Sequence, residues 1–123
     1  MRPARATSRP PLAHPRRNEI RLESVLDALA DPIRLRIVHQ LATGKGEFPY
    51  ARFALPVAKS TATHHFRVLR DGGVIRQYYR GAAKMSILRC EDLDALYPGL
   101  LDSVVTAATR ECGRRAINGG FRP

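Results

Sequence analysis

Two adjacent histidines, His64 and His65, are the residues in this chain most suggestive of chemistry. They lie in the stretch KSTATHHFRVLRDGG, residues 59–73, which has the composition of a short helix. A histidine pair can bind a metal ion, transfer protons or face a nucleic acid. Neighbouring residues of a helix point about 100° apart, and no third ligand lies close in sequence. The pair is therefore a poor metal site.

The same histidines are no better placed for nucleophilic catalysis. Cys90 and Cys112 lie far from them in the sequence, and no Ser-His-Asp spacing is compelling. The cysteines form no CxxC or CxC motif, which favours free thiols in a reducing cytosol over a zinc or redox pair. We expect no catalytic residue, no metal and no cofactor, and therefore a protein that is not an enzyme. The N-terminus is rich in arginine and proline and lacks the apolar segment of a secretory signal, so we expect the protein to be cytoplasmic.

The charge of the chain points to an anionic partner. The 123 residues carry a net charge of +10, with a pI of about 10.8. Residues 48–90 hold eight bases and one acid, whereas residues 91–112 hold one base and five acids. Such a one-sided positive surface suits a nucleic acid. No apolar run approaches the roughly 18 residues of a membrane span, so we expect no membrane partner.

Helical periodicity appears first in residues 18–44. Apolar side chains recur at helical spacing after Asn18, which is a plausible N-cap. A second helix is predicted to follow, with Asp31 as its cap, Pro32 in the first turn and Gly44 as its stop. The next segment, EFPYARFALPV, is either a short helical turn or an extended connector, because its prolines prevent a longer helix.

The histidine pair lies on the helix predicted next, from the N-cap Ser60 to the stop at Gly72 and Gly73. His65 shares the inward face with three apolar residues, so we expect it to be packed and hydrogen-bonded. His64 shares the outward face with Thr63 and Arg67. The free N–H groups at the start of such a helix suit a phosphate, and an outward arginine can reach a guanine edge.

Residues 74–89 predict two strands with a turn between Arg80 and Lys84, and residues 93–108 return to helix. The expected fold is mainly α with a small β-hairpin: a winged helix-turn-helix with a three-helix core, a wing and a terminal dimerisation helix. We expect residues 18–112 to form this domain and residues 113–123 to form a flexible basic tail. Residues 1–17 are expected to be a disordered basic arm that either lies along DNA or keeps the protein in solution.

The blocks LADPIRLRIVHQLA, LPVAKSTATHHFRVLRDGGVI and RCEDLDALYPGLL resemble the ArsR-type winged-helix transcriptional repressors. The resemblance covers about residues 19–105. It implies a homodimer whose terminal helices pack together, and operator DNA bound through a recognition helix, residues 60–71, and a wing, residues 74–89. It also implies release of DNA on binding an inducer, here an unknown small molecule. PYARFALPV lacks the paired cysteines of metal-sensing members, and the last helix has no histidine.

Two sets of residues follow as predicted sites. The double-stranded DNA contacts are expected to be Lys59, Ser60, Thr61, Thr63, His64, Arg67, Arg70, Arg80 and Lys84. Two apolar stripes exceed what a small core needs and are predicted to form the homodimer interface: Leu22, Val25, Leu26, Leu29, Leu101, Val104, Val105 and Ala108. A dimer would read an inverted-repeat operator. The alternative function is nonspecific nucleic-acid binding, of the kind seen in nucleoid-type proteins, which a charge of +10 alone would favour.

Overall fold

The order of helices and strands places a hairpin after three helices and two more helices after the hairpin. The structure is a computed structural model that describes residues 11–44 and 47–117. Along the chain the elements are a 3₁₀ turn Arg17–Glu19, helix α1 Leu22–Leu29, helix α2 Pro32–Gly44, strand β1 Phe48–Pro49, a 3₁₀ turn Tyr50–Arg52, helix α3 Lys59–Asp71, strands β2 Ile75–Arg80 and β3 Ala83–Leu88, and helices α4 Cys90–Leu96 and α5 Leu100–Ile117.

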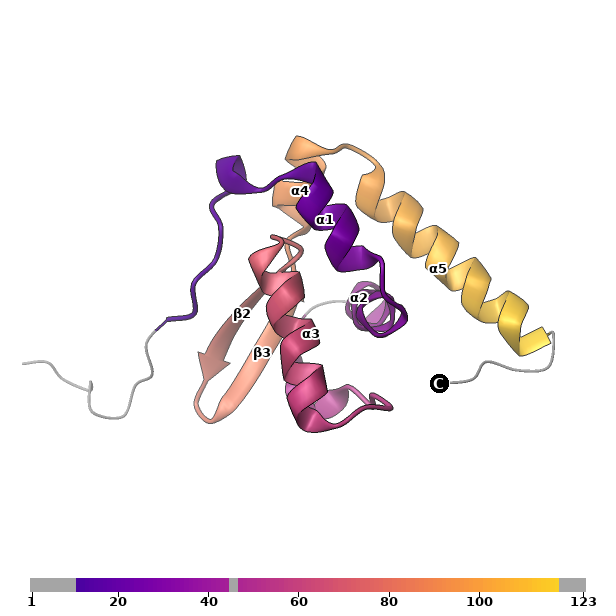
Figure 1. The fold of residues 1–123 in the computed structure, drawn as a ribbon, viewed down its shortest axis with the longest axis horizontal. Coiled ribbons are helices and arrows are strands. Elements are labelled where there is room, and N and C mark those ends of the chain that lie inside the picture. The colour runs from indigo at the N-terminus through magenta and orange to yellow at the C-terminus, as the bar shows by residue number, and fades with distance from the viewer. Residues whose placement is uncertain (1–10, 45–46, 118–123) are drawn as a thin grey trace, which may run out of the picture.

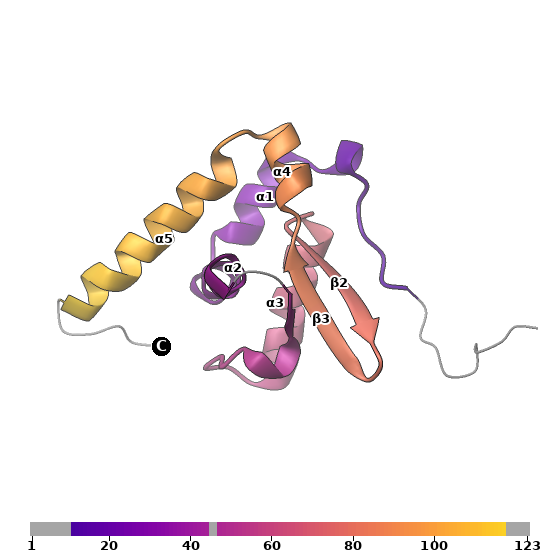
Figure 2. The ribbon, with the colours of Figure 1, turned by 180° about the vertical axis from the view of Figure 1, so that it is seen from behind.

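These elements form a winged helix-turn-helix, as the sequence predicted. Helix α3 packs against α1, α2 and β2, while α5 packs against α2 and α4 (Figure 1). The N-terminal end of α3 and the turn of the β2–β3 hairpin lie at the same end of the molecule (Figure 1). Helix α5 lies on the other side of α2 from the hairpin, which the view from behind also shows (Figure 2).

The helix boundaries confirm some predicted caps and correct others. The Asp31 carboxylate accepts hydrogen bonds from the backbone N–H groups of Ile33 and Arg34, at 2.8 and 3.1 Å, and so caps α2 as predicted. Asn18 does not cap α1: it lies inside the preceding 3₁₀ turn, and the N-cap of α1 is Arg21. Ser60 does not cap α3 either, because the helix begins at Lys59 and its N-cap is Ala58.

The Gly72–Gly73 pair ends α3 as predicted. Gly72 is the C-cap, and Gly73 has a φ of 85°, in the left-handed region that favours glycine. A Cβ at Gly73 would also lie 2.6 Å from Cγ1 of Ile20. Glycine is therefore required here both for the turn into the hairpin and for the close approach of the segment before α1.

The described sheet has three strands in the order β1-β3-β2, all antiparallel. The hairpin pairs Ile75 with Leu88 at its base and Arg80 with Ala83 at its tip. The third strand, β1, pairs Phe48 with Ser86. The EFPYARFALPV segment therefore contains both of the alternatives considered for it, an extended piece and a helical turn.

Both predicted ends of the domain need correction within the described residues. Residues 11–17 are not a disordered arm: they run along the β2 side of the hairpin and make polar contacts with it (Figure 1). Residues 1–10 of that arm lie outside the described residues. Helix α5 continues to Ile117, past the predicted end of the domain at residue 112. The rest of the predicted tail, residues 118–123, is also outside the described part.

The core joins the helices to the hairpin. Its fully buried members include Val25, Ile37, Leu41, Leu69, Ile75 and Leu93. Among the helices of residues 11–44 and 47–117, none is long and apolar enough to cross a membrane. Helix α5 is tied to α2 by a contact between Nε2 of His39 and the hydroxyl of Thr109, at 3.1 Å.

Candidate nucleic-acid interface

Helix α3 presents one buried face and one exposed face. Ala62, His65, Phe66 and Leu69 are buried, as predicted. Six of the predicted DNA contacts are exposed on the other face: Lys59, Ser60, Thr61, Thr63, His64 and Arg67. The helix therefore carries a polar and basic surface on a rigid apolar base.

His65 is fixed beneath this surface by Arg34. Its Nδ1 lies 3.0 Å from Nη1 of Arg34, and 3.9 Å from the carboxylate of Asp31. Because an arginine only donates, Nδ1 is the acceptor of this bond. Burial acts to raise the pKa of Asp31, but the backbone N–H donors of Arg34 and Ile33, together with the positive charge of Arg34, lower it overall. The prediction of a packed, hydrogen-bonded His65 is confirmed.

The first turn of α3 leaves backbone donors available. No side chain caps its start, and the first backbone donor bonded to the N-cap carbonyl is the N–H of Ala62. The hydroxyl of Thr63 donates to the carbonyl of Lys59 at 2.9 Å, so its oxygen keeps its acceptor capacity. Uncapped N–H groups and the positive end of the helix dipole attract an anion such as a phosphate.

Arg70 does not belong to the exposed face. It is half-buried, and its Nη1 donates to Oε1 of Gln77 on β2 at 2.7 Å, while Nε is buried without a partner among the described residues. Nε2 of Gln77 in turn donates to Oγ of Ser86 at 3.0 Å. Arg70 thus joins α3 to the hairpin, which corrects its prediction as an outward DNA contact.

The hairpin brings two further predicted residues to the same end of the molecule. Arg80 pairs with Glu47 at 2.6 Å and lies 5.7 Å from the ring centroid of Tyr78. Nζ of Lys84 lies 6.0 Å from the ring centroid of Tyr79. The pairing with Glu47 partly neutralises the charge of Arg80. Of these two cations, Lys84 therefore attracts an added anion more strongly.

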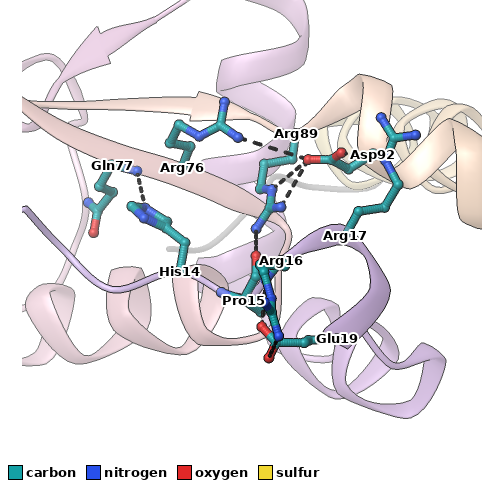
Figure 3. Close-up of polar contacts among 9 residues, drawn as sticks. All are labelled: His14, Pro15, Arg16, Arg17, Glu19, Arg76, Gln77, Arg89 and Asp92. Atoms are coloured by element: carbon teal, nitrogen blue, oxygen red, sulfur yellow. Dashed lines mark hydrogen bonds and ion pairs between the residues drawn. The ribbon is translucent and has the colours of Figure 1, made fainter.

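Sequence reasoning missed a cluster in which the segment before α1 is held against the hairpin and α4 (Figure 3). Asp92 pairs with Arg17 at 2.7 Å, with Arg89 at 2.9 Å and with Arg76 at 4.0 Å. Arg89 also donates to the carbonyl of Pro15 at 2.8 Å. The pKa of Asp92 is lowered overall. The hydrogen bond from Arg17 lowers it most, burial raises it, and the hydrogen bond and charge of Arg89 lower it further.

His14 closes this cluster at the outer edge of β2. Its Nε2 accepts the backbone N–H of Gln77 at 2.9 Å (Figure 3). Burial lowers the pKa of His14, and the positive charges of Arg70, Arg76 and Arg89 lower it further. The ring is therefore held neutral, which is the form that can accept this bond. These partners are 63 to 75 residues apart in sequence, so no local pattern signals them.

The predicted dimer residues divide into two groups. Leu22 and Leu26 are 43% and 46% exposed, the large exposed hydrophobic side chains of the described residues. Val104, Val105 and Ala108 are half-buried. The other three lie in the core of the single chain, which corrects their assignment to the interface: Val25, Leu29 and Leu101.

The two cysteines are free thiols on exposed residues. Cys90 begins α4 directly after the hairpin, and Cys112 lies in the last turns of α5. Burial raises the pKa of the Cys90 thiol, and the nearby carboxylates of Asp94 and Asp102 raise it further. Within residues 11–44 and 47–117, no group of three or more His, Cys, Asp or Glu side chains is arranged to hold a metal ion.

Comparison with known proteins identifies similar structures. No protein-family model matches the sequence, and no curated protein sequence matches it. The crystal structure of an ArsR family transcriptional regulator is 22% identical, with a TM-score of 0.53, covering 81% of this chain and 93% of that one. The transcriptional repressor BigR from Xylella fastidiosa is also 22% identical, with a TM-score of 0.55, covering 70% of this chain and 84% of that one. At this identity the likeness shows a shared fold.

Proposed function

We propose that this chain is an ArsR-type transcriptional repressor that binds an inverted-repeat operator as a homodimer. The observation that carries the proposal is the joint surface of α3 and the hairpin. Helix α3 carries six exposed polar or basic side chains. Its N-terminal end lies at the same end of the molecule as the hairpin turn (Figure 1), which Arg80 and Lys84 flank. The two similar structures are named as transcriptional regulators, which supports the same function.

The parts of this surface suit different parts of a duplex. Arg67 is exposed in the middle of α3, where a guanidinium can donate two hydrogen bonds to O6 and N7 of a guanine. The uncapped first turn, with Lys59, Ser60 and Thr61, suits a backbone phosphate. Lys84 and Arg80 suit phosphates or the adjacent minor groove. His64 lies beside Thr63 on the exposed face and is in reach of the same groove.

The homodimer part of the proposal rests on the apolar surface far from the hairpin tip. Leu22 and Leu26 are exposed one turn apart on α1, and exposed apolar side chains in a cluster mark interaction surfaces. Val104 and Val105 of α5 are half-buried and pack partly against the core, so each leaves some apolar surface exposed. A two-fold interface places two α3 helices to read half-sites about 34–36 Å apart.

Selection of bound duplexes from a random DNA pool, followed by titration at several salt concentrations, tests the DNA part. We expect an inverted repeat to be enriched and to bind at least about 10³-fold more tightly than a scrambled duplex. Equal affinity for both duplexes, with the same salt dependence, would instead support the nonspecific nucleic-acid-binding alternative, for which the net charge of +10 is the supporting observation.

Light scattering tests the homodimer with Leu22→Glu and Leu26→Glu. Because both side chains are exposed in the single chain, the variants should stay folded while the dimer dissociates at micromolar concentration. Ser103→Glu adds the same charge to an exposed position of α5 and should leave the dimer intact. A wild-type chain that is monomeric at micromolar concentration and still binds a full operator tightly contradicts the proposed interface.

A further inference from the structure

A cleft separates the N-terminal half of α3 from the hairpin. Its volume is about 390 Å³, and residues of β1, the Tyr50–Arg52 turn, α3, β2 and β3 line it. Sites for small molecules are typically clefts of about 300–1,000 Å³ with apolar walls and a few placed polar groups. The volume of the cleft therefore lies near the lower end of this range.

Two ammonium groups line this cleft from different elements. Lys59 comes from α3 and Lys84 from β3. Nζ of Lys59 lies 6.0 Å from the ring centroid of Tyr50, and Nζ of Lys84 lies at the same distance from that of Tyr79, so each cation stands over an aromatic wall. Two positive charges around one small space attract an anion.

The choice of lysine at these positions is unusual for this chain. The sequence has 18 arginines and only 3 lysines, and both lysines in the described residues line the cleft. A lysine carries its charge at one point on a flexible stem, whereas an arginine offers a wide planar fork. Two flexible point charges can both approach a single acidic group without the fixed planar geometry that a guanidinium requires.

The inner lining of the cleft is largely apolar. Phe66 is 3% exposed and Pro49 and Ala83 add further apolar surface. Gln77 is the buried polar residue of the lining, and its amide already bonds Arg70 and Ser86. A strongly hydrated phosphate of the DNA backbone gains nothing from an apolar lining, so DNA binding alone does not account for the apolar part of the cleft.

We propose that this cleft binds a small planar aromatic carboxylate, with the ring against the apolar lining and the carboxylate between Lys59 and Lys84. The regulatory consequence rests on the proposed function. Because the two lysines are also proposed DNA contacts, the carboxylate and DNA compete for them. The ligand is therefore an inducer that acts by direct competition at the DNA-binding surface.

Isothermal titration calorimetry with 2-naphthoate tests the site on the full chain. We expect one saturable site per chain with a dissociation constant below about 1 mM. The Lys59→Met/Lys84→Met variant should bind at least tenfold more weakly, while Arg110→Met, which removes a charge from the exposed side of α5, should bind normally. The absence of saturable binding overturns the proposal, as does equal binding of the neutral 2-naphthamide or of inorganic phosphate.

A second variant separates the ligand site from the DNA contacts. Ala83→Leu fills the cleft and keeps both lysines, so it should lose 2-naphthoate and still bind DNA, with circular dichroism confirming its fold. Wild-type affinity of this variant for 2-naphthoate places the ligand elsewhere and overturns the site. If 2-naphthoate binds as expected but its saturation leaves DNA affinity unchanged, the competition is wrong. If it binds and the chain binds no duplex, the proposed function fails while the site stands.

Discussion

Arg34 holds helix α3 in place, and its replacement by methionine should destabilise the fold. Its Nε donates to the carbonyl of Ala28 at 2.7 Å, its Nη2 to that of Asp27 at 3.3 Å, and its Nη1 to Nδ1 of His65 at 3.0 Å. One side chain thus joins the end of α1, the start of α2 and the buried face of α3. Methionine keeps most of the apolar stem and removes all three donors.

The size of the loss follows from these contacts. A hydrogen bond from a charged donor contributes about 1.5–3 kcal/mol, and a buried acceptor left without a partner costs about 1–3 kcal/mol. The contact with Asp27 is long and exposed, so we count only the bonds to Ala28 and His65. Because Arg34 is half-buried, water replaces part of what is lost. We expect Arg34→Met to lower the free energy of unfolding by about 2–4 kcal/mol.

Urea unfolding followed by circular dichroism measures this loss. For a chain of this size the slope is about 2 kcal/mol per molar urea, so the midpoint should fall by about 1–2 M. Protein concentration must be held constant, because the proposed dimer would make the apparent stability depend on concentration. Arg110→Met is the control and should change stability by less than about 0.5 kcal/mol. A loss below about 1 kcal/mol for Arg34→Met would show that these bonds do not anchor α3.

Three further predictions concern the DNA surface and the segment before α1. Arg67→Ala should weaken binding to the selected operator by about 1–3 kcal/mol at matched salt, and unchanged affinity would show that Arg67 contacts no base. Replacing Arg80 and Lys84 by glutamine should weaken specific and scrambled duplexes alike and lower the salt slope by about one to two, whereas a constant slope with loss of specific binding only would make the hairpin a reader of bases. Because the pKa of His14 is lowered in the folded protein, the stability contributed by its neutral ring is fully present above its ordinary pKa of 6.5 and is lost as pH falls from there through the lowered pKa. Stability of the wild type should therefore fall more steeply than that of His14→Leu between pH 7 and 5, and parallel profiles would show that the contact contributes nothing.

Local patterns in the sequence predicted the parts of the fold that depend on near neighbours. Helix periodicity and capping alone predict the Asp31-Pro32 start of α2, the Gly72-Gly73 end of α3 and the placement of His64 and His65 on different faces of α3. These features are set within a turn or two of the chain. That is why they could be read before the fold was known.

The remaining features depend on contacts between distant residues. Strand β1 exists because two residues pair with β3 more than 35 positions later. Residues 11–17 have the composition of a disordered arm, and they are ordered through Asp92, Arg89 and the edge of β2. The apolar stripe of α1 is wide enough to serve both the core and the surface, so periodicity could not separate Val25 from Leu26. Burial by neighbouring helices makes that distinction.

Chemical-shift mapping by NMR with the selected operator tests the central claim that the face formed by α3 and the hairpin binds DNA. We expect the largest changes at the backbone amides of residues 59–67 and 80–84, with little change at residues 102–110 on α5. Neutralising Lys59 and Arg67 should reduce these changes together with affinity. Changes centred on α5, or spread evenly over the chain, would contradict the account.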